Sequence, residues 1–183
     1  VLAGSCRGAT DRAGGFATVA AVEIRPLERR DADATRAIYN DAVNAGIANL
    51  DHFPRTAEEH LAWVDDHFGS HPAIVAVDDD DTVLGYAAVS PYQTRTGYTT
   101  TVEDSIYVHT AHHGQGVGRA MLNHLCQLAG DMGFHTMIAR VTSGNDGSIA
   151  LHEACGFERI GVEREVGRKR GHWFDVVVLQ RML

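Results

Sequence analysis

The stretch "VHTAHHGQGVGRAMLNHL", residues 108–125, places three glycines at alternate positions directly before a run with helical spacing. Because Gly114, Gly116 and Gly118 carry no side chain, backbone N–H groups can approach a single point there. A helix that begins at this point adds the positive end of its dipole. The pattern therefore favours an anion site, most often for a phosphate, and a simple turn between a strand and a helix is the alternative.

Two common phosphate-binding motifs do not fit this loop. A P-loop ends in Gly-Lys-Ser/Thr, whereas this chain has Gly118-Arg119-Ala120. A dinucleotide fingerprint needs G-x-G-x-x-G early in the chain, whereas the spacing here is G-x-G-x-G beyond its middle. The surrounding elements have to decide what the loop binds.

Length and charge restrict the class of protein further. The chain has 183 residues, which suits a single domain with one substantial core. Its formal charge of −8 provides no general attraction to nucleic acid or to an anionic membrane, and no apolar run reaches the length of a membrane helix. Cys6, Cys126 and Cys155 show no CxxC spacing, so we expect a cytoplasmic protein without a cysteine nucleophile.

The pattern along the chain predicts an α+β (α/β) fold with a central mixed sheet. Residues 1–20 are rich in glycine and alanine and are expected to form an N-terminal extension before a domain at 22–183. A capping box, Thr56-x-x-Glu59, opens one expected helix, and Met121, Leu122 and Leu125 mark the core face of another. The expected elements are an edge strand "VEIRPL", helices 31–44 and 56–67, strands "AIVAVD", "VLGYAAVS" and "TVEDSIYV" (101–108), a helix after the glycine loop, strand "TMIARV", a short helix ending at Gly156, and strands "FERIGVEREV" and "HWFDVVVLQRM".

This succession resembles the GNAT family of acetyl-CoA-dependent N-acetyltransferases over residues 22–183. The most specific pieces are "SIYVHTAHHGQGVGRAML" and "NDGSIALHEACGF". "TVEDSIYV", "LHEACGF" and "GHWFDVVVLQRML" are similar to the phosphinothricin and methionine sulfoximine acetyltransferase branch. The resemblance implies a mostly antiparallel, splayed sheet flanked by helices, a homodimer, no metal, and acetyl transfer to the primary amine of a small amino-acid-like substrate.

The resemblance also implies how acetyl-CoA binds. The family's loop, Arg/Gln-x-x-Gly-x-Gly/Ala, falls on residues 113–118, with His113 in place of the usual Arg or Gln. Loop N–H groups would hold the pyrophosphate, and the strand end would splay and pair with the pantetheine arm. Asn145 and Ser148 would touch this arm, or would serve only as a helix cap. The implied coenzyme-binding residues are Ile106, Tyr107, Val108, His113, Gly114, Gln115, Gly116, Val117, Gly118, Arg119, Asn145 and Ser148.

Glu103 and His152 are the catalytic candidates that the resemblance implies. Glu103 matches the branch's general base, directly or through a water, and without the resemblance it reads as an exposed strand carboxylate. Its neighbour Asp104 should point to the opposite face, so only one of the two is expected to face the cleft. His152 replaces the family's tyrosine and either protonates the leaving thiolate or only contacts the coenzyme. With no cysteine at a covalent position, direct attack in a ternary complex is expected.

The segment "PYQTRTGY" maps onto the branch's amino-acid pocket, where Arg95 would meet an anionic substrate group. The implied substrate-binding residues are Tyr92, Arg95, Thr96, Gly97 and Tyr98. Gln93 and Thr99 stand where some branch members carry basic residues, which indicates an altered preference. The basic stretch "GRKRGHW", residues 167–173, is expected to be a solvated turn or to supply cations at a subunit boundary.

Other functions remain open at this point. "HTAHH" (His109, His112 and His113) could be read as a metal site, although its spacing matches no common zinc pattern. A non-catalytic acyl-CoA-binding regulator and an acetyltransferase for a polyamine, an antibiotic or a peptide N-terminus are the further alternatives.

Overall fold

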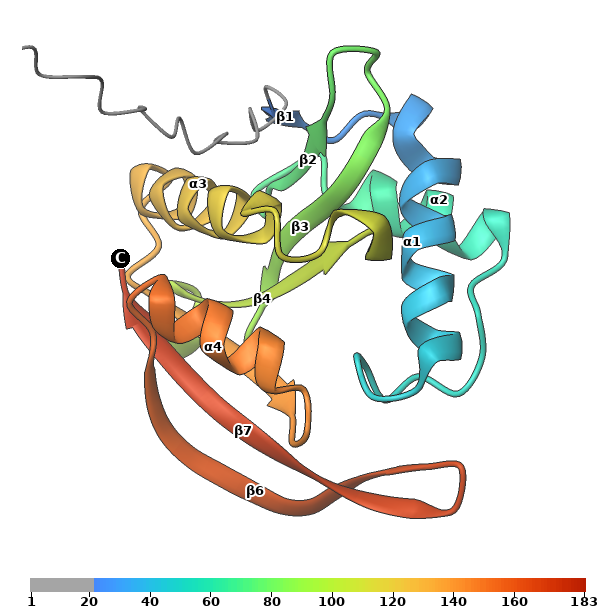
Figure 1. Cartoon of the computed structure of the whole chain (residues 1–183). Helices are drawn as coiled ribbons and strands as arrows, with labels where there is room; N and C mark the ends of the chain where they lie inside the picture. Colours follow the sequence, from blue (N-terminus) through green and yellow to red (C-terminus); the bar gives the residue numbers. More distant parts are fainter. Residues whose placement is uncertain (1–21) are drawn as a thin grey trace, which may run out of the picture.

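The computed structural model describes residues 22–183, which form a seven-stranded sheet with helices on both faces (Figure 1). The expected extension 1–20 and Cys6 lie outside the described residues. The strand order is β1-β2-β3-β4-β5-β7-β6, and within residues 22–183 only the β4–β5 pair is parallel. This confirms the mixed, mostly antiparallel sheet and the edge position of the first strand. The strands are β1 (Glu23–Pro26), β2 (Ala73–Val77), β3 (Val83–Pro91), β4 (Thr101–Val108), β5 (Thr136–Thr142), β6 (Glu158–Lys169) and β7 (His172–Met182).

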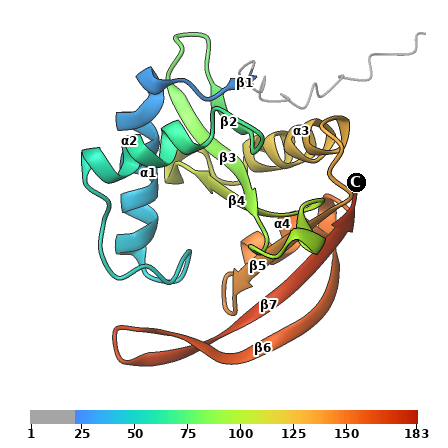
Figure 2. The same cartoon turned by 180° about the vertical axis from the view of Figure 1, so that it is seen from behind.

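Helices α1 and α2 cover one face of the sheet, and α3 and α4 cover the other (Figures 1 and 2). The capping box predicted for α2 is present, because the N–H of Glu59 donates to Thr56 Oγ1 and the N–H of Thr56 donates to Glu59 Oε2. The helical elements are α1 (Ala32–Ala45), α2 (Ala57–Asp66), α3 (Val117–Asp131), α4 (Asp146–Ala154) and the 3₁₀ turns η1 (Arg29–Asp31), η2 (Thr96–Tyr98) and η3 (Thr110–His112).

The core divides into two layers, one on each side of the sheet. Successive side chains of a strand point to opposite faces, so Ile74 contacts the α3 layer whereas Val75 contacts the α1–α2 layer. Met121, Leu122 and Leu125 are fully buried in the α3 layer, as their helical spacing predicts. The central strands are thus packed on both faces, whereas β6 at the edge of the sheet is largely exposed.

That separation lies between β4 and β5. The two strands pair only from Thr101 to Glu103, which face Thr136 to Ile138. Beyond Glu103, β4 continues along β3, whereas β5 continues along β7. The splay predicted at Ile106–Val108 is therefore confirmed, and it leaves one edge of β4 without a neighbouring strand in the part of the chain that the structure describes.

The tip of the β6–β7 hairpin reaches the C-terminal end of α1 (Figures 1 and 2). Lys169 is 2% exposed, and its Nζ donates to the carbonyls of Val43 (2.9 Å) and Asn49 (3.1 Å). Arg170 donates to the carbonyl of Asn44 at 2.7 Å. Cations suit the negative end of a helix dipole and satisfy carbonyls that the helix leaves free. The expectation of a solvated turn is wrong for Lys169, which anchors the hairpin to α1.

Candidate active site

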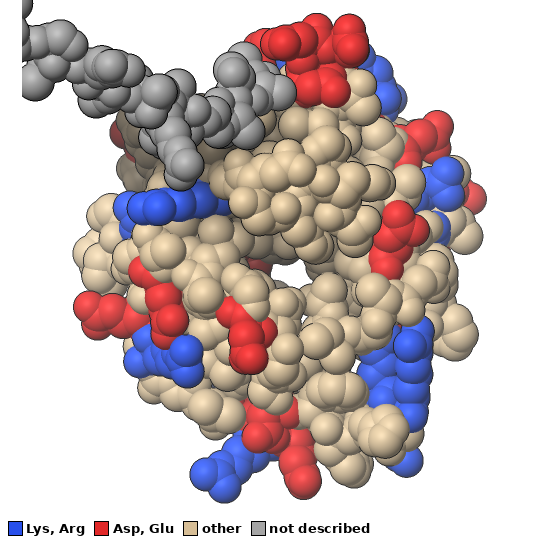
Figure 3. Space-filling view, viewed as in Figure 1, with Lys and Arg blue, Asp and Glu red and all other residues tan. Residues whose placement is uncertain are grey.

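Two cavities of about 560 Å³ and about 480 Å³ meet where the sheet splays. Both are lined by Ile106 and Tyr107 of β4, by Asn145 and Ser148 at the start of α4, and by Ala48 after α1. Figure 3 shows an opening near the centre of this face of the molecule. We call the larger cavity the acceptor cavity and the smaller cavity the loop cavity. Because their walls are shared, a group bound in one can reach a group bound in the other.

The glycine loop lies in the loop cavity and has the geometry of an anion site. Gly114 and Gly116 have φ angles of 73° and 86°, a conformation that glycine adopts without strain, and Gly116 caps α3. Gly116 has no side chain to satisfy the first N–H groups of α3, which lack partners within the helix. A Cβ built at Gly118 would lie 3.2 Å from Leu151 Cδ2, so glycine also permits the close approach of α4. These features fit a bound pyrophosphate.

The open edge of β4 supplies further hydrogen-bonding groups. The N–H of His109 donates to the Leu84 carbonyl of β3, at 2.8 Å. N–H groups of alternate residues point the same way, so those of Ile106 and Val108 point away from β3, toward the splay. An extended amide chain could pair with this edge as an added strand would. The geometry therefore fits the pantetheine arm of a coenzyme.

Two loop side chains that the resemblance assigned to the coenzyme hold the loop itself. His113 Nε2 donates to the Val108 carbonyl at 2.9 Å, and Gln115 Nε2 donates to the Ala111 carbonyl at 2.9 Å. Every other predicted coenzyme residue lines the loop cavity, as His113 also does, whereas Gln115 does not. Asn145 Oδ1 accepts a hydrogen bond from the N–H of Ser148, so the capping interpretation of this pair is confirmed while both residues still line the two cavities.

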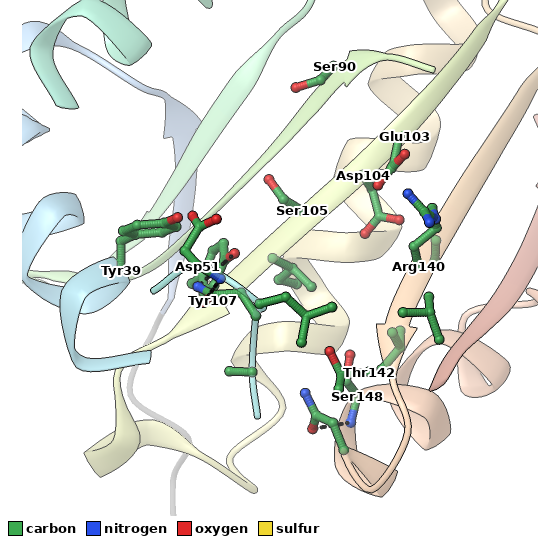
Figure 4. A pocket seen from close by; sticks show the side chains of 18 of the residues that line it. Tyr39, Asp51, Ser90, Glu103, Asp104, Ser105, Tyr107, Arg140, Thr142 and Ser148 are labelled. Atoms are coloured by element: carbon green, nitrogen blue, oxygen red, sulfur yellow. Dashed lines mark hydrogen bonds between the residues drawn. The ribbon is translucent and has the colours of Figure 1, made fainter. Parts of the chain in front are cut away.

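Glu103 lines the acceptor cavity at the point where the strands separate (Figure 4). Burial raises the pKa of its carboxyl, and the nearby guanidinium of Arg140 partly opposes this effect. Arg140 itself is held by Glu163, with 3.1 Å between Nε and Oε2. A carboxylate with a raised pKa in a cavity can accept a proton, which is the role of a general base.

Asp104 points to the opposite face, as predicted, and its Oδ2 lies 3.1 Å from His152 Nε2. Both Glu103 and Asp104 nevertheless line the acceptor cavity, so the expectation that only one could face the cleft is wrong. A regular strand separates its two faces, but here the sheet is open beside β4 and the cavity reaches both. Asp104 Oδ1 is buried and has no hydrogen-bond partner among the described residues.

His152 is buried between two acceptors. Its Nδ1 lies 2.7 Å from the Ser148 carbonyl, and its Nε2 faces the Asp104 carboxylate. A carbonyl can only accept, so Nδ1 carries a proton, and an ionised Asp104 requires a second proton on Nε2. Burial lowers the pKa of His152, but the hydrogen bond and charge of Asp104 outweigh this effect and raise its pKa. The pair thus holds a proton beside the acceptor cavity.

An aromatic wall that the sequence did not indicate closes the acceptor cavity on the α1–α2 side. Tyr107 contacts Tyr39 and Tyr86, with ring centroids 5.4 Å and 5.3 Å apart, and Trp63 stands beside Tyr86. Arg55 lies over the Tyr39 ring, 3.8 Å from its centroid. These residues come from α1, α2, β3, β4 and the connection before α2, so no local motif could have grouped them.

The predicted substrate segment lies apart from both cavities in the single chain. Tyr92, Arg95, Thr96, Gly97 and Tyr98 line neither cavity, and the stretch from Arg95 to Tyr98, which includes η2, is exposed. The ring centroids of Tyr92 and Tyr98 are 5.7 Å apart, so the segment folds back on itself just before β4. Its role in substrate binding stays a prediction.

The structure does not support a metal site or a cysteine nucleophile within residues 22–183. His109 Nδ1 accepts from the N–H of Ala111, and no cluster of His, Cys, Asp or Glu within residues 22–183 could hold a metal ion. Burial raises the pKa of the Cys126 thiol to about 12 and also raises that of Cys155, which leaves both thiols protonated at neutral pH. In the described part of the chain, no helix is long and apolar enough to span a membrane.

Known proteins resemble this chain in sequence and in fold. The acetyltransferase (GNAT) family model matches residues 34–157. The chain is 37% identical to an L-methionine sulfoximine/L-methionine sulfone acetyltransferase of Pseudomonas aeruginosa, over 86% of this chain and 92% of that protein. It is 36% identical to a phosphinothricin N-acetyltransferase of Alcaligenes faecalis, over 89% of this chain and 83% of that protein. A Sinorhizobium meliloti phosphinothricin acetyltransferase, solved in complex with acetyl-CoA, superposes with a TM-score of 0.85 at 35% identity, covering 88% of each chain. The glycine loop, the splayed sheet and these matches together establish that the chain belongs to the GNAT family of N-acetyltransferases, which use acetyl-CoA.

Proposed function

We propose that this enzyme acetylates the primary amine of a small amino-acid-like substrate, of the phosphinothricin or methionine sulfoximine type, by direct attack in a ternary complex. The observation that carries the proposal is the meeting of two cavities at the splay, one with the glycine loop and the other with Glu103. Two reactants can occupy such a site together, which removes the need for a covalent enzyme intermediate. The names of the relatives support the substrate class.

The residues divide the chemical work by position. Acetyl-CoA, when bound, supplies the activated acetyl group as a thioester. Glu103 takes the proton from the substrate ammonium, because it lines the acceptor cavity and burial raises its pKa. The N–H groups of Ile106 and Val108 point into the splay, where they can stabilise negative charge on the carbonyl oxygen. His152 carries the proton that the departing thiolate needs, or holds the coenzyme in place.

A free-thiol release assay tests the proposed function. Wild-type enzyme with acetyl-CoA is offered amino acids, phosphinothricin, methionine sulfoximine and sulfone, polyamines, aminoglycosides and peptide N-termini. We expect the fastest release with the amino-acid analogues. Preference for one of the other amines would identify a different acetyltransferase, and binding of acetyl-CoA without release for any amine would identify a regulator.

Replacement of the proposed base tests the mechanism. Glu103→Gln keeps the shape of the side chain but removes its basic oxygen, so turnover should fall by about 10²- to 10⁴-fold while acetyl-CoA affinity stays nearly unchanged. The variant should regain activity at high pH, where the amine is already deprotonated. Wild-type turnover by Glu103→Gln at neutral pH would leave Glu103 as a structural residue, and bulk water would then take the proton.

We also propose a cytoplasmic homodimer, from the chemistry of the surface and from the family. The β6–β7 hairpin carries four large apolar side chains that are each more than half exposed, Ile160, Val162, Val166 and Trp173, and exposed apolar side chains on one element support an interaction surface there. Cys126 and Cys155 are free, which suits a reducing compartment. Light scattering at micromolar concentration should give twice the mass of one chain, and a monomer would refute the dimer.

A further inference from the structure

Three cationic side chains of the described residues line the acceptor cavity, and two of them are paired with carboxylates. Arg140 is held by Glu163, and His152 is held by Asp104. Arg55 is the third, and its guanidinium forms no ion pair within residues 22–183. A guanidinium without a carboxylate partner in a polar cavity is a candidate to bind an anionic group of a ligand.

Hydrogen bonds to its main chain and an aromatic ring beside its guanidinium fix the position of Arg55. Its N–H donates to Asn40 Oδ1 at 2.8 Å, and its carbonyl accepts from Asn40 Nδ2 at 3.0 Å. Its guanidinium lies 3.8 Å from the centroid of the Tyr39 ring and 5.6 Å from that of Trp63. A stacked guanidinium keeps its N–H groups free around its rim, where they match the two oxygens of a carboxylate. Arg55 is therefore oriented before any ligand binds.

We infer that Arg55 binds the α-carboxylate of the amino-acid substrate in a two-pronged contact, an inference that rests on the proposed function. An amino acid carries an ammonium and a carboxylate, and the acceptor cavity presents a proton-accepting carboxylate, Glu103, and a free cation, Arg55. Asp51 lines the same cavity without pairing with Arg55, and because it is exposed, water screens its charge. The carboxylate subsite of this chain is thus built by the segment before α2 and by α1, and not by Arg95, which lies outside both cavities.

The test uses two substitutions of Arg55, the variant Arg95→Gln, a control and two forms of the acceptor. Arg55→Gln removes the charge, whereas Arg55→Lys keeps it but lacks the planar fork. Both should fold, because Asn40 holds the main chain of residue 55 and not its side chain. Arg29→Gln is the matched control, since Arg29 is exposed and lies outside both cavities. The acceptors are L-methionine sulfone and its C-terminal amide, which lacks the negative charge.

We expect Arg55→Gln to raise the KM for methionine sulfone by about 10- to 100-fold, the worth of a charged hydrogen bond, and Arg55→Lys to raise it less. The KM for acetyl-CoA and the KM for the amide should stay at the wild-type values, and Arg29→Gln should change the KM of neither acceptor. An equal KM increase for the acid and the amide would overturn the carboxylate contact, because lost packing and not lost charge would then explain it. Loss of acid binding in Arg95→Gln with none in Arg55→Gln would return the role to Arg95.

Calorimetry separates this inference from the proposed function. Titration of methionine sulfone into wild-type protein and into Arg55→Gln, each with coenzyme A present, measures acceptor binding without turnover. Weaker binding by Arg55→Gln supports the subsite even if no thiol is released, in which case only the transferase proposal fails. Equal binding by the two proteins, or no binding by wild-type protein, overturns the subsite.

Discussion

The protonation of the Asp104–His152 pair can be tested through stability. Asp104→Asn retains the shape of the side chain, and its amide can donate to His152 Nε2, so the imidazole no longer needs its second proton. The substitution therefore exchanges a charged hydrogen bond of about 1.5–3 kcal/mol for a neutral one of about 0.5–1.5 kcal/mol. Since both side chains are at most 3% exposed, little of this difference is lost to solvent screening. We expect Asp104→Asn to lower the free energy of unfolding by about 1–2 kcal/mol at pH 6.

The pH dependence of that loss is more decisive than its size. The pKa of His152 is raised above 6.5, so its stabilising contribution is complete below about pH 6.5 and disappears as pH rises through the pKa of the folded state. Urea denaturation of wild-type and Asp104→Asn proteins from pH 5.5 to 9 should therefore give a difference that shrinks with increasing pH. The comparison cancels other titrating groups, because both proteins contain them. Ring nitrogen NMR shifts of His152 supply an independent measure of its protonation.

A stability difference that does not change with pH would refute the doubly protonated ring. NMR shifts of a neutral imidazole at pH 6 in the wild-type protein would refute it as well. Asp104 would then have to carry the shared proton, and His152 could not supply one to a leaving thiolate.

Three further substitutions test other parts of the structure. Gly116→Val should weaken acetyl-CoA binding at least tenfold by calorimetry. Gly133 is the control position, because it has a similar positive φ but lies outside both cavities. Gly133→Val should lower stability through the same backbone strain of about 1–2 kcal/mol and leave acetyl-CoA binding unchanged. Burial lowers the pKa of His60 to about 4, so the unfolded state binds a proton at this residue before the folded state does. The free energy of unfolding of the wild-type protein should therefore fall by up to about 3 kcal/mol between pH 6.5 and pH 4. His60→Gln should lack this decrease in denaturation curves. Lys169→Met should cost about 2–4 kcal/mol in urea denaturation because two carbonyls lose a charged donor, whereas exposed Arg168→Met should cost less than about 1 kcal/mol.

Sequence reasoning succeeded where structure is decided by neighbours in the chain. The glycines at 114 and 116 take the positive φ that only their lack of a side chain makes easy, and Thr56 with Glu59 closes a box across one turn. The strand at 101–108 and the loop after it follow from such local signals, and so does the alternation that sends Glu103 and Asp104 to opposite faces.

It failed where residues far apart in the chain meet. Lys169 reads as part of a charged turn, yet it is buried because carbonyls more than 100 residues earlier receive its ammonium. His152 is paired with a carboxylate on another element, and Arg55 sits in a connection without motif. Such contacts depend on how the strands are ordered in the sheet, and a local pattern carries no information about that order.

The anchoring of the β6–β7 hairpin to α1 also determines when the molecule can first bind its ligands. Lys169 meets Val43 across 126 positions of the chain, and β7 enters the sheet between β5 and β6. Contacts of such long range form late, since a large loop must close before they contribute. On the ribosome the glycine loop and Glu103 emerge well before β7, but the acceptor cavity then lacks the part of its wall that Val166 of β6 and Val176 of β7 supply. A growing chain that ends before the hairpin should therefore not bind the acceptor substrate tightly, and that substrate should stabilise only molecules whose synthesis has passed β7.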